Sequence, residues 1–366
     1  MQTVLDGHAL ESLRLSTLSR QMLLERADAG VLDALGRLAG LNAQHRRSPY
    51  IALWSRLRAF QRSDLETALT AGHVVKATLM RGTLHLVPAE AHTSYFIGLT
   101  DARERALRSF FPRVAASIDG DRLRGILRPK LSTASMAFRE LERVLQPHFP
   151  EAPPQSLSFA AKSLAPLVQT PPSAAFAAGG APMYRWVDFA SGIRPEGAQE
   201  FLFDRYLRAF GPATLQDFAQ WSGLGLKEAE AVRARLGDRL EDLAWGSVTY
   251  LDIPGLPPPT DSTRPPARLL PRWDNLLLAY KDRTRILPKD LQHKVIMRDG
   301  RVLATFLAEG EVAGTWTVEE SVPQCTVVLL PLRKLSAQVL DDVRQEADAL
   351  ARWLCPEGSA GHRLAT

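Results

Sequence analysis

The stretch from Gly40 to Pro88, GLNAQHRRSPYIALWSRLRAFQRSDLETALTAGHVVKATLMRGTLHLVP, decides how this chain folds. It opens with two amides, Asn42 and Gln44, and runs directly into a basic cluster at residues 45–47. A helical pattern follows, and the stretch closes on an apolar hairpin pattern that turns at 81–82. Hydrogen-bonding amides, positive charge and a protruding hairpin in so short a space predict a surface that contacts nucleic acid.

Local signals inside this stretch predict two helices and a hairpin. Ser48 before Pro49 is typical of a helix start, and Ser63 with Glu66 three residues later is typical of a capping box. Apolar residues then alternate over 75–86, which favours two strands joined by a tight turn. Helices followed by a hairpin form the winged-helix pattern, a helix-turn-helix variant with a β wing.

Similar patterns recur along the chain. Residues 103–130 hold eight Lys/Arg against three acids, an amphipathic helix is predicted over 135–145, and a hairpin over 171–188. Residues 214–236 carry a strong helix-turn-helix signal, in which Thr214 caps the first helix. We therefore predict an α+β fold of mainly helical tandem winged-helix domains with β-hairpin wings.

The expected domain boundaries follow from these patterns. A first winged helix is expected over 1–102, a second over 103–195 and a third over 196–258, before a proline-rich linker at 254–266. The remaining residues, 259–366, are expected to form a small β-rich region with a closing helix. Short strands are predicted at 295–297, 302–307, 312–318 and 325–330, and the helix at 336–354.

Composition narrows the class of protein. The 366 residues are 45% hydrophobic and 23% charged, as in a well-cored globular chain. The formal charge of +5 is carried mainly by arginine, which favours nucleic acid as a partner, although a solvated basic surface explains +5 equally well. The two distant cysteines, Cys325 and Cys355, favour neither a disulfide scaffold nor a zinc site. Without a visible secretory signal or membrane-spanning run, we expect a cytoplasmic, nucleoid-associated protein.

Five phrases of the sequence carry a family resemblance. They are GLNAQHRRSPYIALWSRL, LMRGTLHLVP, FGPATLQDFAQWSGL, LLPRWDNLLLAYKDRTR and DGRVLATFLAEGEVAGTW. Over nearly the whole chain, and in this order, they resemble the AlkZ-type winged-helix proteins, which are bacterial DNA glycosylases. The resemblance implies a C-shaped array of three winged helices with a basic channel for duplex DNA, and a monofunctional glycosylase that uses neither metal nor cofactor.

The resemblance also implies which residues do the chemistry. Better-known members carry a Gln-X-Gln motif, and a second branch carries Gln-X-Asp, where this chain has Asn42-Ala43-Gln44. Asn42 and Gln44 are therefore the expected catalytic residues, with Asn42 one methylene shorter than the family's glutamine. The alternative is that both amides only cap or turn the chain before the helix that starts at Ser48.

Two amides suit only one kind of leaving group. Asn and Gln cannot protonate a base at neutral pH, but they can orient a water molecule. A purine alkylated at N7 or N3 is already cationic and leaves as a neutral base without an acid. The enzyme then has only to position the water and to stabilise the charge that develops on the sugar. The expected substrates are alkylated purines in double-stranded DNA, including crosslinked ones.

Two sets of residues are expected to contact DNA. Contacts to DNA phosphates are expected from the residues that follow the amides, His45, Arg46 and Arg47. The set at the hairpin tip, expected in the minor groove, is Met80, Arg81, Gly82 and Thr83. The alternatives are a solvated turn for the first set and, for Arg81, an ordinary wing contact to phosphate. His85 and His92 lack further ligands for a metal and are expected in the core or on the surface.

Two functions from different classes remain open at this point. The leading one is a DNA repair glycosylase that acts as a monomer and reads DNA through its backbone and shape. The rival is a non-catalytic winged-helix DNA-binding protein or transcriptional regulator. It is supported by the asparagine at position 42 and by the helix-turn-helix at 214–236.

Overall fold

The computed structural model describes residues 7–171, 173–177, 180–189, 191–256, 264–321 and 324–365. Its N-terminal elements are α1 (Gly7–Arg20), α2 (Val31–Arg37), β1 (Leu41–Asn42), α3 (Ser48–Arg56), α4 (Arg62–Thr70), β2 (Val74–Thr78), the 3-10 turn η1 (Met80–Gly82) and β3 (Leu84–Pro88). The predicted hairpin is confirmed, because β2 and β3 pair antiparallel along their whole lengths and turn through η1. β1 pairs with the other edge of β3. This sheet therefore fixes the start of the turn that carries Asn42 and Gln44, here called the amide turn.

The helix starts differ from the predicted caps. Ser48 is the first residue of α3 and does not cap it, and its buried hydroxyl has no hydrogen-bond partner among the described residues. Helix α4 begins at residue 62, where the backbone N–H of Gln61 donates to the Asp64 carboxylate over 2.7 Å. The capping box predicted at Ser63 and Glu66 is therefore wrong by two residues: an acid at the third helical position already serves the residue before the helix.

The second part of the chain is mainly helical. Its elements are η2 (Ala89–Ala91), α5 (His92–Gly98), α6 (Thr100–Phe110), α7 (Pro112–Ser117), α8 (Gly120–Leu131), β4 (Met136–Ala137), α9 (Phe138–Leu145), η3 (Gln146–His148), α10 (Pro154–Leu164), β5 (Leu167–Gln169) and β6 (Met183–Trp186). β5 and β6 form an antiparallel pair, but β5 lies before residue 171, so only the second strand of the hairpin predicted over 171–188 is present, and part of the segment between the strands lies outside the described residues. A separate apolar core, which includes Leu123, Leu141 and Leu157, holds these helices together.

The hairpins of the first two predicted units belong to one sheet. Its strand order is β1-β3-β2-β5-β6-β4, and the two hairpins meet where Lys76 and Ala77 pair with Gln169 and Val168. Pairing the two hairpins covers edges that each would otherwise expose. A sheet that crosses the boundary expected at 102–103 joins the first two units firmly, and the division of the chain into four domains stays a prediction.

The helix-turn-helix is confirmed in the third part. Here lie α11 (Pro195–Phe210), α12 (Leu215–Ser222), α13 (Leu226–Leu236), η4 (Gly237–Arg239), β7 (Glu241–Trp245) and β8 (Val248–Asp252), and the last two form a hairpin. As expected, Thr214 caps α12, since its hydroxyl accepts the Asp217 N–H over 3.1 Å. The linker predicted at 254–266 lies largely outside the described residues.

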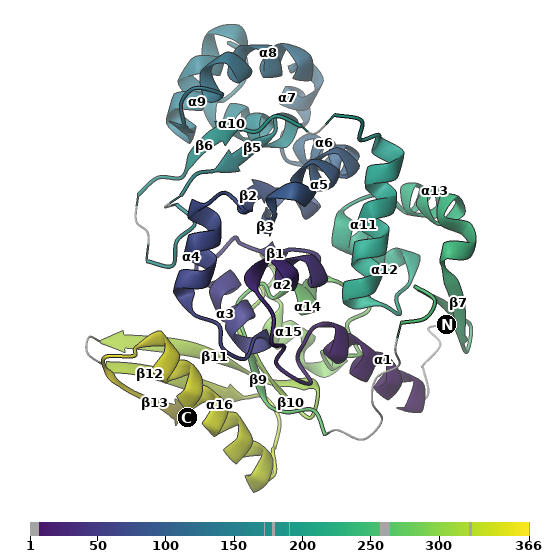
Figure 1. Cartoon of the computed structure of the whole chain (residues 1–366), viewed down its shortest axis with the longest axis vertical. Coiled ribbons are helices and arrows are strands. Elements are labelled where there is room, and N and C mark those ends of the chain that lie inside the picture. Colours follow the sequence, from purple (N-terminus) through teal and green to yellow (C-terminus); the bar gives the residue numbers. More distant parts are fainter. Residues whose placement is uncertain are drawn as a thin grey trace.

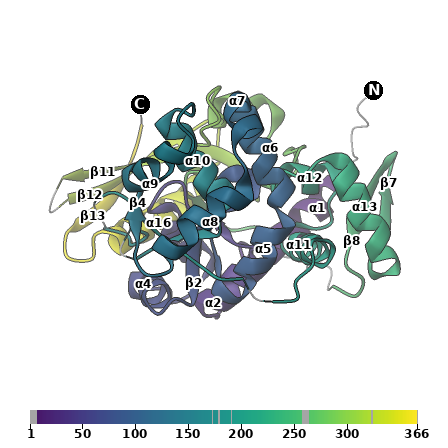
Figure 2. The same ribbon diagram turned by 90° about the horizontal axis from the view of Figure 1, so that it is seen from above.

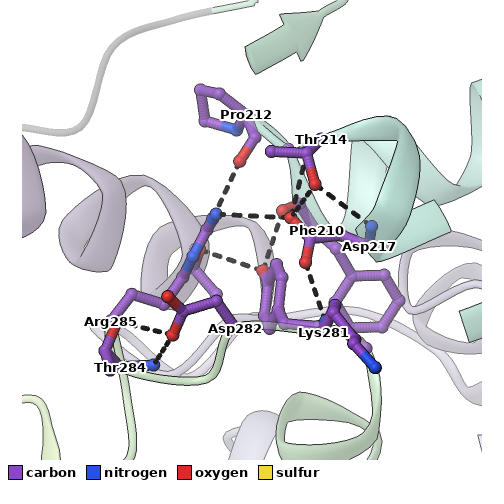
Figure 3. A network of polar contacts seen from close by, with 12 residues as sticks. Phe210, Pro212, Thr214, Asp217, Lys281, Asp282, Thr284 and Arg285 are labelled. Atoms are coloured by element: carbon purple, nitrogen blue, oxygen red, sulfur yellow. Dashed lines mark hydrogen bonds and ion pairs between the residues drawn. The ribbon is translucent and has the colours of Figure 1, made fainter. Parts of the chain in front are cut away.

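A polar network ties this helix-turn-helix to the segment after residue 279 (Figure 3). The buried carboxylate of Asp217 accepts hydrogen bonds from Thr214 and from the Lys281 N–H over 2.8 Å each. Arg285, also buried, lies 4.0 Å from Asp217 and donates to the Pro212 carbonyl over 2.8 Å. These contacts hold the start of α12 in place and give the sequence phrase around 280–285 a structural role.

The C-terminal part contains a five-stranded sheet in the order β13-β12-β11-β10-β9. Its elements are β9 (Arg268–Leu270), α14 (Asn275–Leu278), η5 (Lys289–Leu291), α15 (Gln292–Val295), β10 (Thr305–Ala308), β11 (Glu311–Ser321), β12 (Gln324–Pro331), α16 (Ala337–Leu354) and β13 (Ser359–Leu364). Three of the predicted strands and the closing helix are present. The strand predicted at 295–297 is reduced to an isolated antiparallel bridge between Ile296 and Val302, because α15 extends to Val295, and β13 was not predicted.

Figure 1 shows how these parts surround the N-terminal stretch. The helices α7 to α10 lie at the top, α11 to α13 at the right, and the C-terminal sheet with α16 at the lower left. α2, α3 and the strands β1 to β3 lie between them, so the amide turn is central, and Figure 2 shows the C-terminal sheet and the β7–β8 hairpin at opposite ends. Across the described residues, no helix combines the length and apolar character needed to cross a membrane.

Candidate active site

The amide turn begins on a fixed backbone. The side-chain oxygen of Asn275, at the start of α14, accepts the Asn42 backbone N–H over 2.9 Å, and its amide nitrogen donates to the Gly40 carbonyl over 2.8 Å. The Ala43 N–H donates to the Leu84 carbonyl on β3 over 2.7 Å. Asn275 is 2% exposed, so a buried amide from a distant segment holds the chain on both sides of β1.

The two amides of the motif are placed differently. Asn42 is 4% exposed, and its side-chain oxygen accepts the Gln44 N–H over 3.1 Å, which is the turn-stabilising role expected as the alternative. Gln44 is exposed, and its side-chain oxygen accepts the Leu84 N–H over 3.1 Å. Because both oxygens face backbone N–H groups, the amide nitrogens point elsewhere, and neither donates to a described residue.

Gln44 faces a basic cavity of about 500 Å³. The cavity lies between the amide turn, β2 and the segment that follows β5. Its lining residues are Gln44, His45, Arg46, Arg47, Lys76, Leu84, Gln169, Ser173, Phe176, Ala177, Gly180 and Pro182. These described lining residues include cations and amides but no carboxylate, so the cavity favours an anion such as a DNA phosphate.

The three basic residues after the amides occupy different environments. Arg46 is exposed and forms no ion pair with the described residues. Arg47 forms a two-pronged ion pair with Glu320 of β11, and its guanidinium lies 4.8 Å from the centre of the Phe176 ring. Burial lowers the pKa of His45, and the neighbouring arginines at 272, 47 and 46 add to the lowering, so this imidazole is mainly neutral at neutral pH. Arg46 is thus the cation most available to a phosphate.

The hairpin tip does not protrude. Met80 is 0% exposed and packs in the main apolar core, so the expectation that Met80 wedges into a DNA groove is wrong for this structure. The Arg81 guanidinium donates to the Trp221 carbonyl in α12, and burial, helped by Arg283, lowers the pKa of Arg81 to about 10. Gly82 and Thr83 are half-buried. α6 and α12 pack over the turn of the hairpin, as the close approach of Gly82 to α6 illustrates, and a DNA contact from the half-buried residues of this turn stays a prediction.

A family model described as "DNA glycosylase AlkZ-like" matches residues 35–353 of this chain. The chain belongs to the AlkZ-like DNA glycosylase family. The interstrand DNA cross-link repair glycosylase of Streptomyces sahachiroi is 25% identical over 92% of this chain and 94% of its own length. The solved structure of DNA glycosylase AlkZ from the same organism superimposes with a TM-score of 0.82 at 20% identity, covering 97% of this chain and 99% of that one.

Several residues around the amide turn and its cavity were not expected from the sequence. Lys76 and Gln169, which line the cavity from β2 and β5, are 7% and 5% exposed. A lysine inside the apolar run of β2 was the one available signal for Lys76. Asn275 and Glu320 reach the amide turn from segments more than 200 residues away, and no local pattern marks them.

Other polar residues of this AlkZ-like chain serve the fold. Asp274 caps α14 by accepting the Leu276 N–H over 3.0 Å, and it forms an ion pair with Arg56, 2.8 Å away. His85 and His92 lie in the core, and burial lowers their pKa values to about 3 and about 4. Neither histidine is charged at neutral pH.

Proposed function

We propose that this AlkZ-like protein removes cationic alkylated purines from double-stranded DNA by hydrolysing the N-glycosidic bond. The observation that carries the proposal is Gln44, an exposed amide fixed by the Leu84 N–H beside a cavity suited to DNA phosphates. Family membership supplies the reaction class. The printed name of the Streptomyces sahachiroi relative supports interstrand crosslinks as further substrates.

The proposed mechanism uses the free hydrogen-bonding capacity of Gln44. A carbonyl oxygen has two lone pairs, and the Leu84 N–H occupies one of them. The second lone pair accepts a hydrogen bond from a water molecule and turns its oxygen towards the anomeric carbon. When the new C–O bond forms, the proton of this water passes to solvent. The cationic base leaves as a neutral purine, so no acid is needed, and the flanking phosphates rest against Arg46 and its neighbours.

In this proposal Asn42 acts through Gln44. Its oxygen fixes the Gln44 backbone N–H over 3.1 Å, and its burial keeps it from a large substrate. We therefore assign Asn42 to positioning Gln44, with its amide nitrogen as a further donor to the bound water. A family glutamine at this position would be one methylene longer.

Replacing Gln44 by Ala tests the proposal. We expect release of 7-methylguanine from duplex DNA to fall by roughly 100-fold or more, the usual effect of losing a positioned catalytic group. Binding of the same duplex, followed by fluorescence anisotropy, should change little, since the cations remain. Gln338→Ala, on an exposed face of α16, is the matched control and should leave release unchanged. Undiminished release by Gln44→Ala contradicts the assignment.

The rival function is DNA binding without catalysis. It is favoured by one observation: both amide oxygens of the motif already accept backbone N–H groups, as in a purely structural turn. The same assay separates the two functions. Free base and abasic sites support the glycosylase, whereas sequence-selective footprints without base release support the regulator.

A further inference from the structure

Lys76 is a buried lysine for which the described residues provide no counter-ion. It lies in the middle of β2, is 7% exposed and forms no hydrogen bond or ion pair with a described residue. It nevertheless lines the cavity that Gln44 faces. Burying an ammonium group without a partner is costly, so a position like this is unusual for a purely structural lysine.

A second buried polar group lies beside it. Gln169 on β5 is the cross-strand partner of Lys76, so the two side chains stand next to each other on one face of the sheet. The amide nitrogen of Gln169 donates to the Tyr184 hydroxyl over 2.8 Å, while its oxygen is buried with no partner among the described residues. Among the described residues, the buried Gln169 oxygen has no donor and the Lys76 amine at the cavity has no acceptor, and a ligand in the cavity would supply both.

The charges around Lys76 favour its neutral form. Burial and the nearby Arg46 lower the pKa of Lys76 to about 8. His45 and Arg47 also line the cavity, and none of the described lining residues offers a carboxylate. At pH 7.5 about a quarter of such a lysine is the free amine, against about one part in a thousand at an ordinary lysine pKa. Lysines desolvated beside another cation are the ones that attack carbonyl groups.

We propose that Lys76 captures the abasic product of base release as an imine at C1′ of the sugar. The inference rests on the proposed function, because the water that Gln44 orients attacks C1′ and so brings this atom to the same cavity. Once the base has left, the ring-opened sugar presents an aldehyde at C1′. Water breaks the glycosidic bond, and Lys76 meets only the product, so the protein stays monofunctional in the hydrolytic step.

Imine formation replaces the aldehyde oxygen by the lysine nitrogen. The lone pair of the neutral Nζ forms a bond to C1′, and the carbonyl electrons move to the aldehyde oxygen, which takes up a proton. The resulting carbinolamine loses this oxygen as one molecule of water and becomes a protonated imine. The unpaired Gln169 oxygen accepts an N–H of the attacking amine, which makes Gln169 a positioning residue. Capture shields the reactive aldehyde until a later repair step.

Borohydride trapping on preformed abasic DNA tests the proposal. Borohydride delivers hydride to C1′ of the imine and leaves a stable secondary amine between protein and DNA. We expect a covalent adduct with the wild-type protein, and mass spectrometry of its proteolytic fragments should place the DNA on Lys76. The yield should rise as the pH passes through about 8. Since the abasic site is supplied, Gln44→Ala should still form the adduct even though it fails to release base.

Two variants complete the test. Lys76→Arg keeps the positive charge but cannot form an imine, and it should lower the adduct yield by about tenfold or more. Lys162→Gln is the matched control: Lys162 is also largely buried, packs on Phe138 and Phe159, and does not line the cavity, so the yield should stay unchanged.

Three results overturn the proposal: no adduct with wild-type protein, an adduct mapped to another amine, or an undiminished adduct with folded Lys76→Arg. If Lys76→Arg does not fold, the mapping on the wild-type protein decides. Base release by a wild-type protein that forms no adduct would leave the proposed function standing and remove only the role of Lys76.

Discussion

The Arg56–Asp274 pair shows how single residues hold the candidate site together. Both side chains are 0% exposed, and two hydrogen bonds of 3.0 and 2.8 Å join them. Arg56 ends α3, which follows the amide turn, and Asp274 precedes Asn275, which clamps β1. The pair therefore links both sides of the scaffold on which Gln44 stands.

We predict that Arg56→Ala destabilises the protein by about 3–5 kcal/mol, because it leaves the Asp274 carboxylate buried and unpaired. Urea unfolding monitored by circular dichroism measures the change. Arg37→Ala is the control, since Arg37 pairs with Asp33 at 3.8 Å on an exposed helix face and should cost less than about 0.5 kcal/mol. Equal, small effects of the two substitutions would argue against a structural role for the buried pair.

At the level of elements, the turn of the β2–β3 hairpin packs against the helix-turn-helix. The turn between α12 and α13 contains Gly223, whose φ is +83° and which faces the backbone of Arg81 at the hairpin tip. A Cβ atom added at Gly223 would lie 3.1 Å from the Arg81 Cα. This contact explains why the hairpin tip is covered and why a small residue stands in the turn.

We predict that Gly223→Ala lowers the free energy of unfolding by more than Gly300→Ala does. Both glycines have a φ near +82°, and this conformation costs alanine roughly 1–2 kcal/mol at either site. At Gly300 an added Cβ meets nothing within 4 Å, whereas at Gly223 overpacking adds about 1 kcal/mol or more. Chemical denaturation of the two variants side by side measures the difference, and equal losses would mean that the hairpin tip is not packed on this turn.

Over the whole molecule, sequence reasoning succeeded where the signal is local. Alternation over 75–86 predicts the hairpin, Thr214 marks the cap of α12, and the apolar spacing over 336–354 gives α16. It failed where distant segments decide the outcome. The pairing of Lys76 with Gln169 spans more than 90 residues, and the covering of Met80 depends on helices that the hairpin sequence does not encode.

For the candidate site, too, residues with a local signal were predicted and residues placed by the folded structure were missed. The family resemblance singled out Gln44, and the basic run after the amides singled out Arg46; the structure leaves both side chains exposed. Whether an amide lies on the surface or in a turn is a property of the folded backbone, which is why Asn42 could not be placed beforehand. Lys76 was missed because burial, and not sequence context, gives its amine an unusual pKa.

The central claim is that an amide-positioned water suffices because the substrate base carries its own positive charge. The most direct measurement compares single-turnover release of 7-methylguanine and of hypoxanthine, a neutral purine, from otherwise identical duplexes. We predict that the protein releases 7-methylguanine at least about 100-fold faster, since a neutral base needs an acid and the described lining of the cavity offers no carboxyl group. Release of hypoxanthine at a comparable rate, or no release of 7-methylguanine, would contradict the claim.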